Sequence, residues 1–227
     1  MEIKILYEDK GILICEKPVG EVSQSSGDGD EVSFPARLRA YRRDKGEDSY
    51  IGVVHRLDTS TGGVIMYSKD EALTGKLSEL VSQKEYEKTY LAVVSGRPDE
   101  RGEMTDLLFH DKQKNKTYVV KKTRRGVKEA RLYYELLRTV TLESGESANL
   151  VRIRLFTGRT HQIRVQFASR KMPLLGDGKY GSREKGCVCA LWSYQGRFMH
   201  PKTGKEVCVT STPPNDYPWN LFSSQEN

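Results

Sequence analysis

The sequence predicts an α+β protein with a mixed, largely antiparallel sheet flanked by helices. Apolar runs typical of strands follow one another through short turns, as in residues 3–8 and 11–17 around the turn Asp9–Gly11. Few segments between such runs have helical periodicity. A doubly wound parallel fold, which alternates strands with helices, is therefore disfavoured.

Three helices are predicted between the strands. Ser33 followed by Pro35 has the pattern of a helix start, and this helix runs through residues 38–43. A second helix follows Asp70, because apolar residues recur there at helical spacing. Those apolar residues are Leu73, Leu77, Leu80 and Val81. The segment TGRTHQIRVQFAS, residues 157–169, begins as a turn and continues as the third helix.

Further strands are predicted along the rest of the chain, and the polar residues 17–33 form a loop. In residues 149–156, apolar and basic side chains alternate cleanly, as expected for a strand with one buried face. The sequence shows no internal repeat and no linker. Residues 1–227 are therefore predicted to form a single domain, and its length allows two lobes. The further strands are residues 64–69, 89–96, 116–122, 130–138, 149–156, 188–194, 196–200 and 206–211.

The charge and composition of the chain indicate which partners and which cellular compartment to expect. Lys and Arg exceed Asp and Glu by 37 to 31, a modest excess that favours a polyanionic partner only weakly. Residues 112–128 carry eight basic residues and no acidic one, which fits either a solvated hairpin or a nucleic-acid contact. The charged N-terminus and the lack of a long apolar run predict a cytoplasmic protein without a membrane partner.

The four cysteines predict buried free thiols in that compartment. Cys187 and Cys189 alternate along a predicted strand and could join Cys208 in a metal site, but a lone C-x-C pair is weak evidence for one. The sequence contains no Walker loop, Rossmann glycine pattern, HExxH or CxxC pair. These absences disfavour nucleotide-dependent and zinc-dependent chemistry.

Two polar turns carry the candidate chemistry. HRLDTSTGG, residues 55–63, lies between apolar runs and holds Arg56 and Asp58 together, which chain reversal alone does not require. TGRTHQIR places Arg159 and Arg164 around a helix start, where main-chain N–H groups favour anions. Either turn alone is ambiguous, because arginine-rich turns often form structural salt bridges.

Together these segments resemble the pseudouridine synthases of the RluA type. The resemblance rests on HRLDTSTGG, KTYLAVVSG, TGRTHQIRVQFA with PLLGDGKYG, and the opening DKGILICEKPVG, and it covers about residues 7–214. It implies the pseudouridine-synthase catalytic fold with a central RNA-binding cleft. It also implies an isomerase that converts a specific uridine of structured ribosomal or transfer RNA to pseudouridine.

The resemblance assigns roles residue by residue. Asp58 matches the catalytic aspartate, and Tyr90 matches the tyrosine that stacks on the uracil and is the candidate base. Arg164 matches the arginine that pairs with the catalytic carboxylate, and Arg56 the arginine that fills the space of a flipped base. The residues expected to contact RNA besides Arg56 are Arg159, His161, Lys121, Lys122, Arg124 and Arg125.

The chain departs from the family pattern at a few positions. Thr59 stands where a basic residue is common, Gly62 where a serine is common, and Val188–Ala190 where Leu-His-Ala is common. These departures affect substrate contacts and leave the expected chemistry unchanged. The first catalytic strand begins near Ile3, so no RNA-binding S4 domain is expected before it.

The reaction needs no cofactor, metal or energy source, because nothing is oxidised and the number of bonds is preserved. The expected partner is RNA, and the expected state is a monomer. One alternative is an RNA-binding or chaperone module with a vestigial active site, which substrate turnover would exclude. Another is a metal-dependent phosphodiesterase, which EDTA would inhibit. Its metal ligands would be His55, Asp58, His161 and His200.

Overall fold

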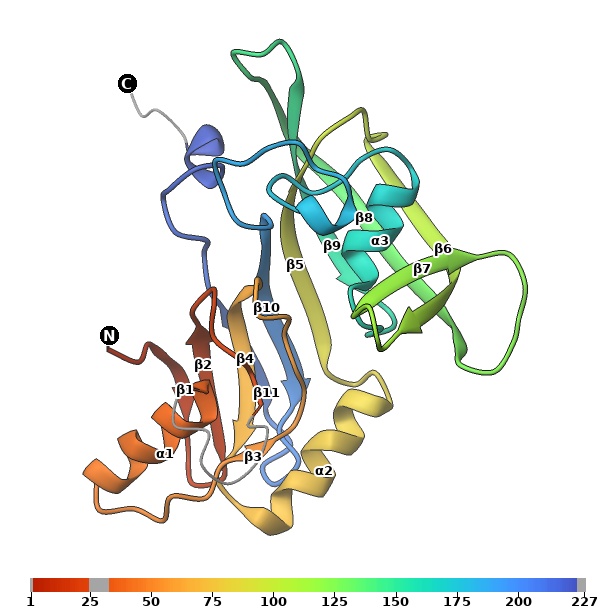
Figure 1. Cartoon of the computed structure of the whole chain (residues 1–227). Helices are drawn as coiled ribbons and strands as arrows, with labels where there is room; N and C mark the ends of the chain where they lie inside the picture. The colour runs from red at the N-terminus through yellow and green to blue at the C-terminus, as the bar shows by residue number, and fades with distance from the viewer. Residues whose placement is uncertain (1, 25–32, 224–227) are drawn as a thin grey trace. The chain divides into compact units, whose positions relative to one another are not determined.

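The computed structural model describes residues 2–24 and 33–223 (Figure 1) and separates into two compact units. Unit 1 comprises Met1–Lys88 and Ser193–Thr212, and unit 2 comprises Thr89–Trp192 and Pro213–Asn227. Each unit combines a β-sheet with few helices, so the predicted α+β class is confirmed. No helix of the described residues is long and apolar enough to cross a membrane.

Unit 1 contains a sheet in which β1, β2, β4 and β10 are neighbours in that order. The short strand β3 pairs with β4, and β11 pairs with β10. Every strand pair with a described register in this unit is antiparallel. The elements that lie wholly or mostly in unit 1 are β1 (Ile5–Glu8), β2 (Ile12–Lys17), α1 (Phe34–Asp44), β3 (Gly52–Val53), β4 (Gly62–Ser68), α2 (Glu71–Ser82), β10 (Leu191–Met199) and β11 (Glu206–Thr210).

Both helices of unit 1 start at the residues that the sequence indicates. The Ser33 side chain accepts a hydrogen bond from the Ala36 main chain, and the Asp70 side chain accepts bonds from the main chain of Ala72 and Leu73. These N-caps satisfy main-chain donors that the first helical turn leaves without partners. The caps therefore explain why two local signals located the helices correctly.

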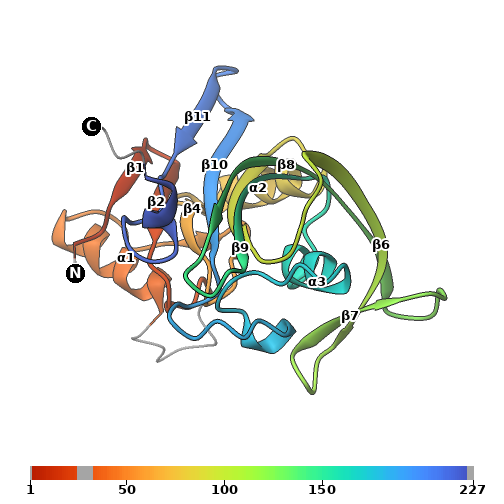
Figure 2. The same ribbon diagram turned by 90° about the horizontal axis from the view of Figure 1, so that it is seen from above.

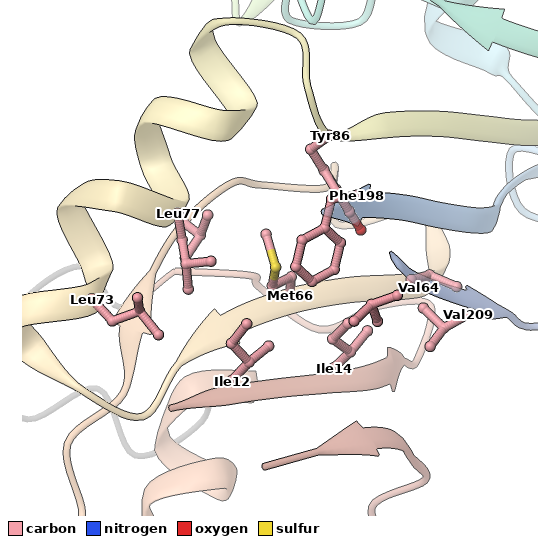
Figure 3. Packing of buried hydrophobic residues seen from close by; sticks show 11 residues of the cluster. Ile12, Ile14, Val64, Met66, Leu73, Leu77, Tyr86, Phe198 and Val209 are labelled. Atoms are coloured by element: carbon pink, nitrogen blue, oxygen red, sulfur yellow. The ribbon is translucent and has the colours of Figure 1, made fainter. Parts of the chain in front are cut away.

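The apolar face of α2 covers the sheet of unit 1. Figure 3 shows Leu73 and Leu77 of α2 beside Ile12 of β2 and Met66 of β4, and all four side chains are buried. Phe198 of β10 belongs to the same cluster. This core fixes β4 in place. Because β4 directly follows the candidate catalytic turn, the core also fixes one end of that turn.

Unit 2 contains a sheet with the strand order β5, β9, β8, β6, β7. In Figure 2, strands β9, β8 and β6 curve around the helix α3. The clean alternation predicted for β9 is confirmed, since Val151 and Ile153 are fully buried whereas Arg152 and Arg154 are exposed. The elements are β5 (Glu87–Val94), β6 (Arg101–Asp111), β7 (Lys116–Val120), β8 (Val127–Thr141), β9 (Ser147–Leu155), α3 (Gln162–Ser169) and the 3-10 turns η1 (Gly178–Tyr180) and η2 (Trp219–Phe222).

The C-terminal strands differ from the prediction. Leu191–Met199 form one strand, β10, where the sequence predicted the two segments 188–194 and 196–200, and Gly196 lies inside this strand rather than at a break. A Cβ atom at Gly196 would lie 2.2 Å from the Tyr86 hydroxyl, so this position needs glycine for close packing. Cys187 and Cys189 precede the strand in irregular structure, contrary to the prediction that they alternate along it.

Other predictions are corrected or only partly tested. Among the four free cysteines, Cys15 and Cys189 are buried as expected, but Cys208 is exposed and Cys187 half-buried. Strand β6, which the sequence did not reveal, is one of the longest strands in unit 2. Residues 25–32, part of the loop predicted at residues 17–33, lie outside the described residues.

Candidate active site

The turn that carries Asp58 is fixed through its main chain. The Ser23 hydroxyl donates to the Leu57 carbonyl at 2.8 Å and accepts from the Leu57 N–H at 3.2 Å. The Gly20 N–H donates to the Thr59 carbonyl at 2.8 Å, and the Thr61 N–H donates to the Asp58 carbonyl at 2.9 Å. The last bond closes a tight turn. Asp58 is therefore presented, half-buried, by a backbone held on both sides.

His55, at the start of the HRLD segment, supports this turn as a neutral imidazole. It is buried, and its Nε2 accepts the Met66 N–H at 3.1 Å. Burial and the nearby Lys88 ammonium hold the pKa of His55 well below its usual value of 6.5. The ring therefore links the turn to β4, and its Nε2 lone pair is already used. Within the described residues, no three His, Cys, Asp or Glu side chains cluster as metal ligands.

Lys17 places a buried positive charge near Asp58, and the sequence did not single it out. Its side chain is fully buried at the end of β2, where Nζ donates to the carbonyls of Pro18 at 2.7 Å and Glu21 at 2.8 Å. Burial lowers the pKa of Lys17 to about 8, while the carboxylates of Glu21 and Asp58 oppose that shift. A cation near Asp58, the Lys17 ammonium, therefore comes from the same unit as Asp58.

Arg56 and Tyr90 occupy contrasting environments in the two units. Arg56 is exposed, and its Nη1 donates to the Gln24 side chain at 3.4 Å. Such an exposed guanidinium can move to meet a ligand. Tyr90 lies in β5 and is only 6% exposed, so its ring is held in place by its surroundings.

Arg164 is held by a buried carboxylate that the sequence did not reveal. Its Nε donates to Asp177 Oδ2 at 2.6 Å and its Nη2 to Asp177 Oδ1 at 2.7 Å. The two side chains are 8% and 1% exposed, and the Tyr180 ring centroid lies 5.2 Å from Arg164 Cζ. A two-bond pair of this kind fixes the plane of the guanidinium. The predicted pairing of Arg164 with Asp58 joins residues of different units and stays a prediction.

Arg159 and His161, predicted to contact RNA, have internal partners in unit 2. The half-buried Arg159 donates through Nε to the Glu129 carbonyl at 2.9 Å. His161 is 8% exposed in a left-handed conformation with φ 54°, and its Nδ1 lies 2.9 Å from the Tyr180 hydroxyl. His161 therefore contributes to the support of α3, and an RNA contact by either residue stays a prediction.

Comparison with known proteins shows the family of this chain. The family profile described as RNA pseudouridylate synthase matches residues 11–169, which include both Asp58 and Arg164. The chain belongs to this family. Membership of the RNA pseudouridylate synthases makes it an isomerase of the RluA type, as the resemblance implied.

Individual relatives cover most of this pseudouridylate synthase. "Ribosomal large subunit pseudouridine synthase C" of Buchnera aphidicola subsp. Baizongia pistaciae is 31% identical over 223 residues, covering 94% of the chain and 67% of that relative. "Ribosomal large subunit pseudouridine synthase D" of Zymomonas mobilis is 28% identical over 94% of the chain and 70% of the relative. The chain spans about two thirds of the length of the curated relatives it matches.

Solved structures confirm the fold. The human RNA pseudouridylate synthase domain containing 1 aligns with a TM-score of 0.75 and 21% identity, covering 94% of this chain and 84% of that chain. The human domain containing 4 aligns with a TM-score of 0.74 and 22% identity, covering 96% and 91%. The predicted pseudouridine-synthase fold is therefore confirmed.

The basic residues predicted to contact RNA lie beside β7 in this pseudouridylate synthase. Lys121, Lys122, Arg124 and Arg125 are exposed in the connection between β7 and β8. The structure therefore groups these four cations at one end of the sheet of unit 2. It also places Tyr90, Arg164 and Asp177 in that unit, whereas Arg56, Asp58 and Lys17 belong to unit 1.

Proposed function

We propose that this chain isomerises a specific uridine of structured RNA to pseudouridine, with Asp58 as the catalytic carboxylate. The observation that carries the proposal is the position of Asp58. It is half-buried on a turn that Gly20 and Ser23 fix, with the buried Lys17 ammonium nearby. Ribosomal RNA is the proposed substrate, because relatives such as those of Buchnera and Zymomonas are named as ribosomal synthases.

The chemistry needs an ionised carboxylate close to the ribose. The bond between C1′ and N1 breaks, the uracil turns, and C5 bonds to C1′ while its hydrogen leaves as a proton. Asp58 can attack C1′, attack C6 of the ring, or remove the proton from C2′, and each route starts from the carboxylate. The Asp58 carboxylate lies near enough to Lys17 to oppose the lowering of the Lys17 pKa by burial, which favours the charged ammonium.

The remaining residues take the roles that the family resemblance implied. Tyr90 offers a ring for stacking and a hydroxyl for proton transfer at C5. Arg164 supplies a guanidinium whose orientation Asp177 fixes, so Asp177 acts as a positioning residue. The exposed Arg56 enters the base stack when the uridine is extruded, a step that costs a few kcal/mol. A monomeric, cytoplasmic enzyme that uses neither metal nor cofactor is part of the same proposal.

Release of tritium from uridine C5 tests the reaction directly. Ribosomal RNA with tritium at C5 is prepared from cells that lack the gene, and label released to water is counted with and without EDTA. We expect release without strand scission and without inhibition by EDTA. Asp58→Asn should abolish release, whereas Asp44→Asn, a matched change at an exposed carboxylate of α1, should not.

Tyr90→Phe adds a second arm to the experiment. The variant keeps the ring but loses the hydroxyl, so RNA binding should persist while release falls if the hydroxyl moves the proton. Strand scission or inhibition by EDTA would contradict the proposal. RNA that stays tightly bound to the unaltered chain without release of label would identify a vestigial module.

A further inference from the structure

The cations of residues 112–128 differ from several other basic residues of unit 2, which are paired with carboxylates. Elsewhere in this unit, Arg131 pairs with Glu103, Arg152 with Glu135 and Arg170 with Asp106. In the described part of the chain, none of the eight basic residues in 112–128 forms an ion pair within 4.0 Å. A group of eight basic residues without carboxylate partners is suited to an external polyanion.

Aromatic rings lie among these cations on one face of the β6–β7 ribbon. Phe109 and Tyr118 are direct partners in the antiparallel register, so both side chains point to the same face. The Arg124 guanidinium lies 4.4 Å from the Phe109 ring centroid, and the Lys116 ammonium lies 5.9 Å from that of Tyr118. We call these four residues the aromatic–basic face.

Tyr118 is the more exposed of the two aromatic residues of this face. Its side chain belongs to a residue that is 37% exposed, among the largest exposures of an aromatic residue in the described chain. Arg124 covers Phe109 but leaves the neighbouring ring of Tyr118 to solvent. An exposed ring flanked by unpaired cations has the composition of a surface that binds single-stranded nucleic acid, where rings stack on bases and cations meet phosphates.

The opposite face of the ribbon is anchored, which holds the aromatic–basic face in place. Thr117 is buried, and its hydroxyl donates to the Thr160 carbonyl at 2.8 Å. The Thr117 N–H donates to the Tyr180 hydroxyl at 2.8 Å, and Lys179 Nζ donates to the Asn115 carbonyl at 3.0 Å. Thr117 and Tyr118 are adjacent and therefore face opposite ways. The anchored ribbon presents Tyr118 without a large loss of conformational freedom on binding.

We propose that the aromatic–basic face is an RNA contact apart from the catalytic residues, in which Tyr118 stacks on an unpaired base. Lys121, Lys122 and Arg125, three to seven residues further along the chain, bind the neighbouring phosphates. This inference rests on the proposed function, because it takes RNA to be the substrate. It specifies that the bound RNA has a single-stranded segment outside the target uridine.

Binding assays with two RNA probes test the stacking contact. One probe is a fluorescent single-stranded oligouridylate of about 12 nucleotides, within the usual site size of single-strand binders. The other is a blunt-ended RNA duplex of equal charge, whose bases are already paired and stacked. The chain carries Asp58→Asn in all assays to prevent turnover, and each dissociation constant is measured over a series of salt concentrations.

Tyr118→Ala should weaken binding of the single strand roughly 5- to 150-fold, as loss of one base stack does, with an unchanged salt slope. Binding of the paired duplex should not change. Tyr118→Phe should keep the affinity because the ring remains. Leu137→Ala is a matched control, because Leu137 is 43% exposed in β8 of the same unit but lies outside residues 112–128.

A variant with Lys121→Gln, Lys122→Gln and Arg125→Gln should behave differently, and it leaves the contact of Arg124 with Phe109 intact. Binding of both probes should weaken, and the salt slope for the single strand should flatten by up to about 0.7 per lost phosphate contact. Unchanged single-strand binding by Tyr118→Ala would overturn the proposal, as would equal losses for both probes. In either case, release of tritium by the chain with intact Asp58 would show that the proposed function still holds.

Discussion

The turn of Asp58 in unit 1 is held by main-chain hydrogen bonds, whereas Arg164 in unit 2 is held by the buried side chain of Asp177. The two residues are therefore expected to respond to mutation in different ways. The Asp58 carboxylate can be changed while the bonds of Gly20 and Ser23 to its turn remain. Arg164 cannot be removed without leaving Asp177 as a buried, unpaired charge, which is strongly destabilising.

The largest expected effect is the loss of activity in Asp58→Asn. Release of tritium should fall by a factor on the order of 10⁴ or more, as for other essential catalytic groups. The free energy of unfolding should change by about 1 kcal/mol or less, because the main chain holds the turn. Denaturant titration checks the second value. A fall of several kcal/mol in the free energy of unfolding would show that the Asp58 side chain, and not only the main chain, holds the turn. Residual activity above a few per cent would show that Asp58 is not the catalytic carboxylate.

Arg164→Met should affect both stability and activity. Breaking the buried pair with Asp177 should lower the free energy of unfolding by about 3–5 kcal/mol. Adding Asp177→Leu removes the stranded charge, and replacement of a whole buried pair by apolar groups is often neutral. The double variant should therefore recover stability in denaturant titration and remain inactive. Recovery of activity together with stability would show that Arg164 is purely structural.

The buried Lys17 should give stability a measurable pH dependence. Its pKa is about 8 in the folded chain, against 10.5 as the ordinary value, so the unfolded chain binds more protons between these pH values. The free energy of unfolding should therefore rise with pH from 8 to 10.5, by up to about 3 kcal/mol in total. Lys17→Met should lack this contribution. Subtracting its free energy of unfolding from that of the unaltered protein at each pH cancels the contributions of the other titrating groups. A difference that does not vary with pH would show that Lys17 titrates normally.

Ser23→Ala should have the smallest effect. It removes both hydrogen bonds to Leu57, so stability should fall by about 1–2 kcal/mol and turnover should decrease as the turn loosens. Ser82→Ala is a matched control, because its hydroxyl bonds only within its own helix, to the Glu79 carbonyl. Equal stability of the two variants would indicate that Ser23 does not fix the turn.

The elements that the sequence predicted well are those specified by neighbouring residues. Ser33 and Asp70 cap helices a few residues away, and the alternation of β9 lies within one segment. Strand β6 was missed because its polar residues interrupt the apolar pattern. Glu103 and Asp106 are acceptable in that strand since Arg131 and Arg170, which are distant in sequence, pair with them.

In the candidate site too, the sequence did not reveal residues whose role depends on partners distant in the chain. Motif resemblance named Asp58, Tyr90 and Arg164, but Asp177 stands between two glycines and reads as an ordinary turn residue. Its importance comes from a partner 13 positions earlier in the chain, which only the fold brings close. Lys17 was missed for a similar reason, since nothing near it in sequence shows that its side chain is fully buried.

The division of unit 1 into two chain segments has a consequence for synthesis on the ribosome. Phe198, Val207 and Val209 of the second segment complete its apolar cluster, and β10 covers the edge of β4. At roughly 5–20 residues per second, the interval of about 100 residues between Lys88 and Ser193 lasts on the order of 5–20 seconds. During that time the first segment has an exposed strand edge and an incomplete core. A nascent chain stalled before Ser193 should therefore be the form most prone to aggregation and most dependent on chaperones.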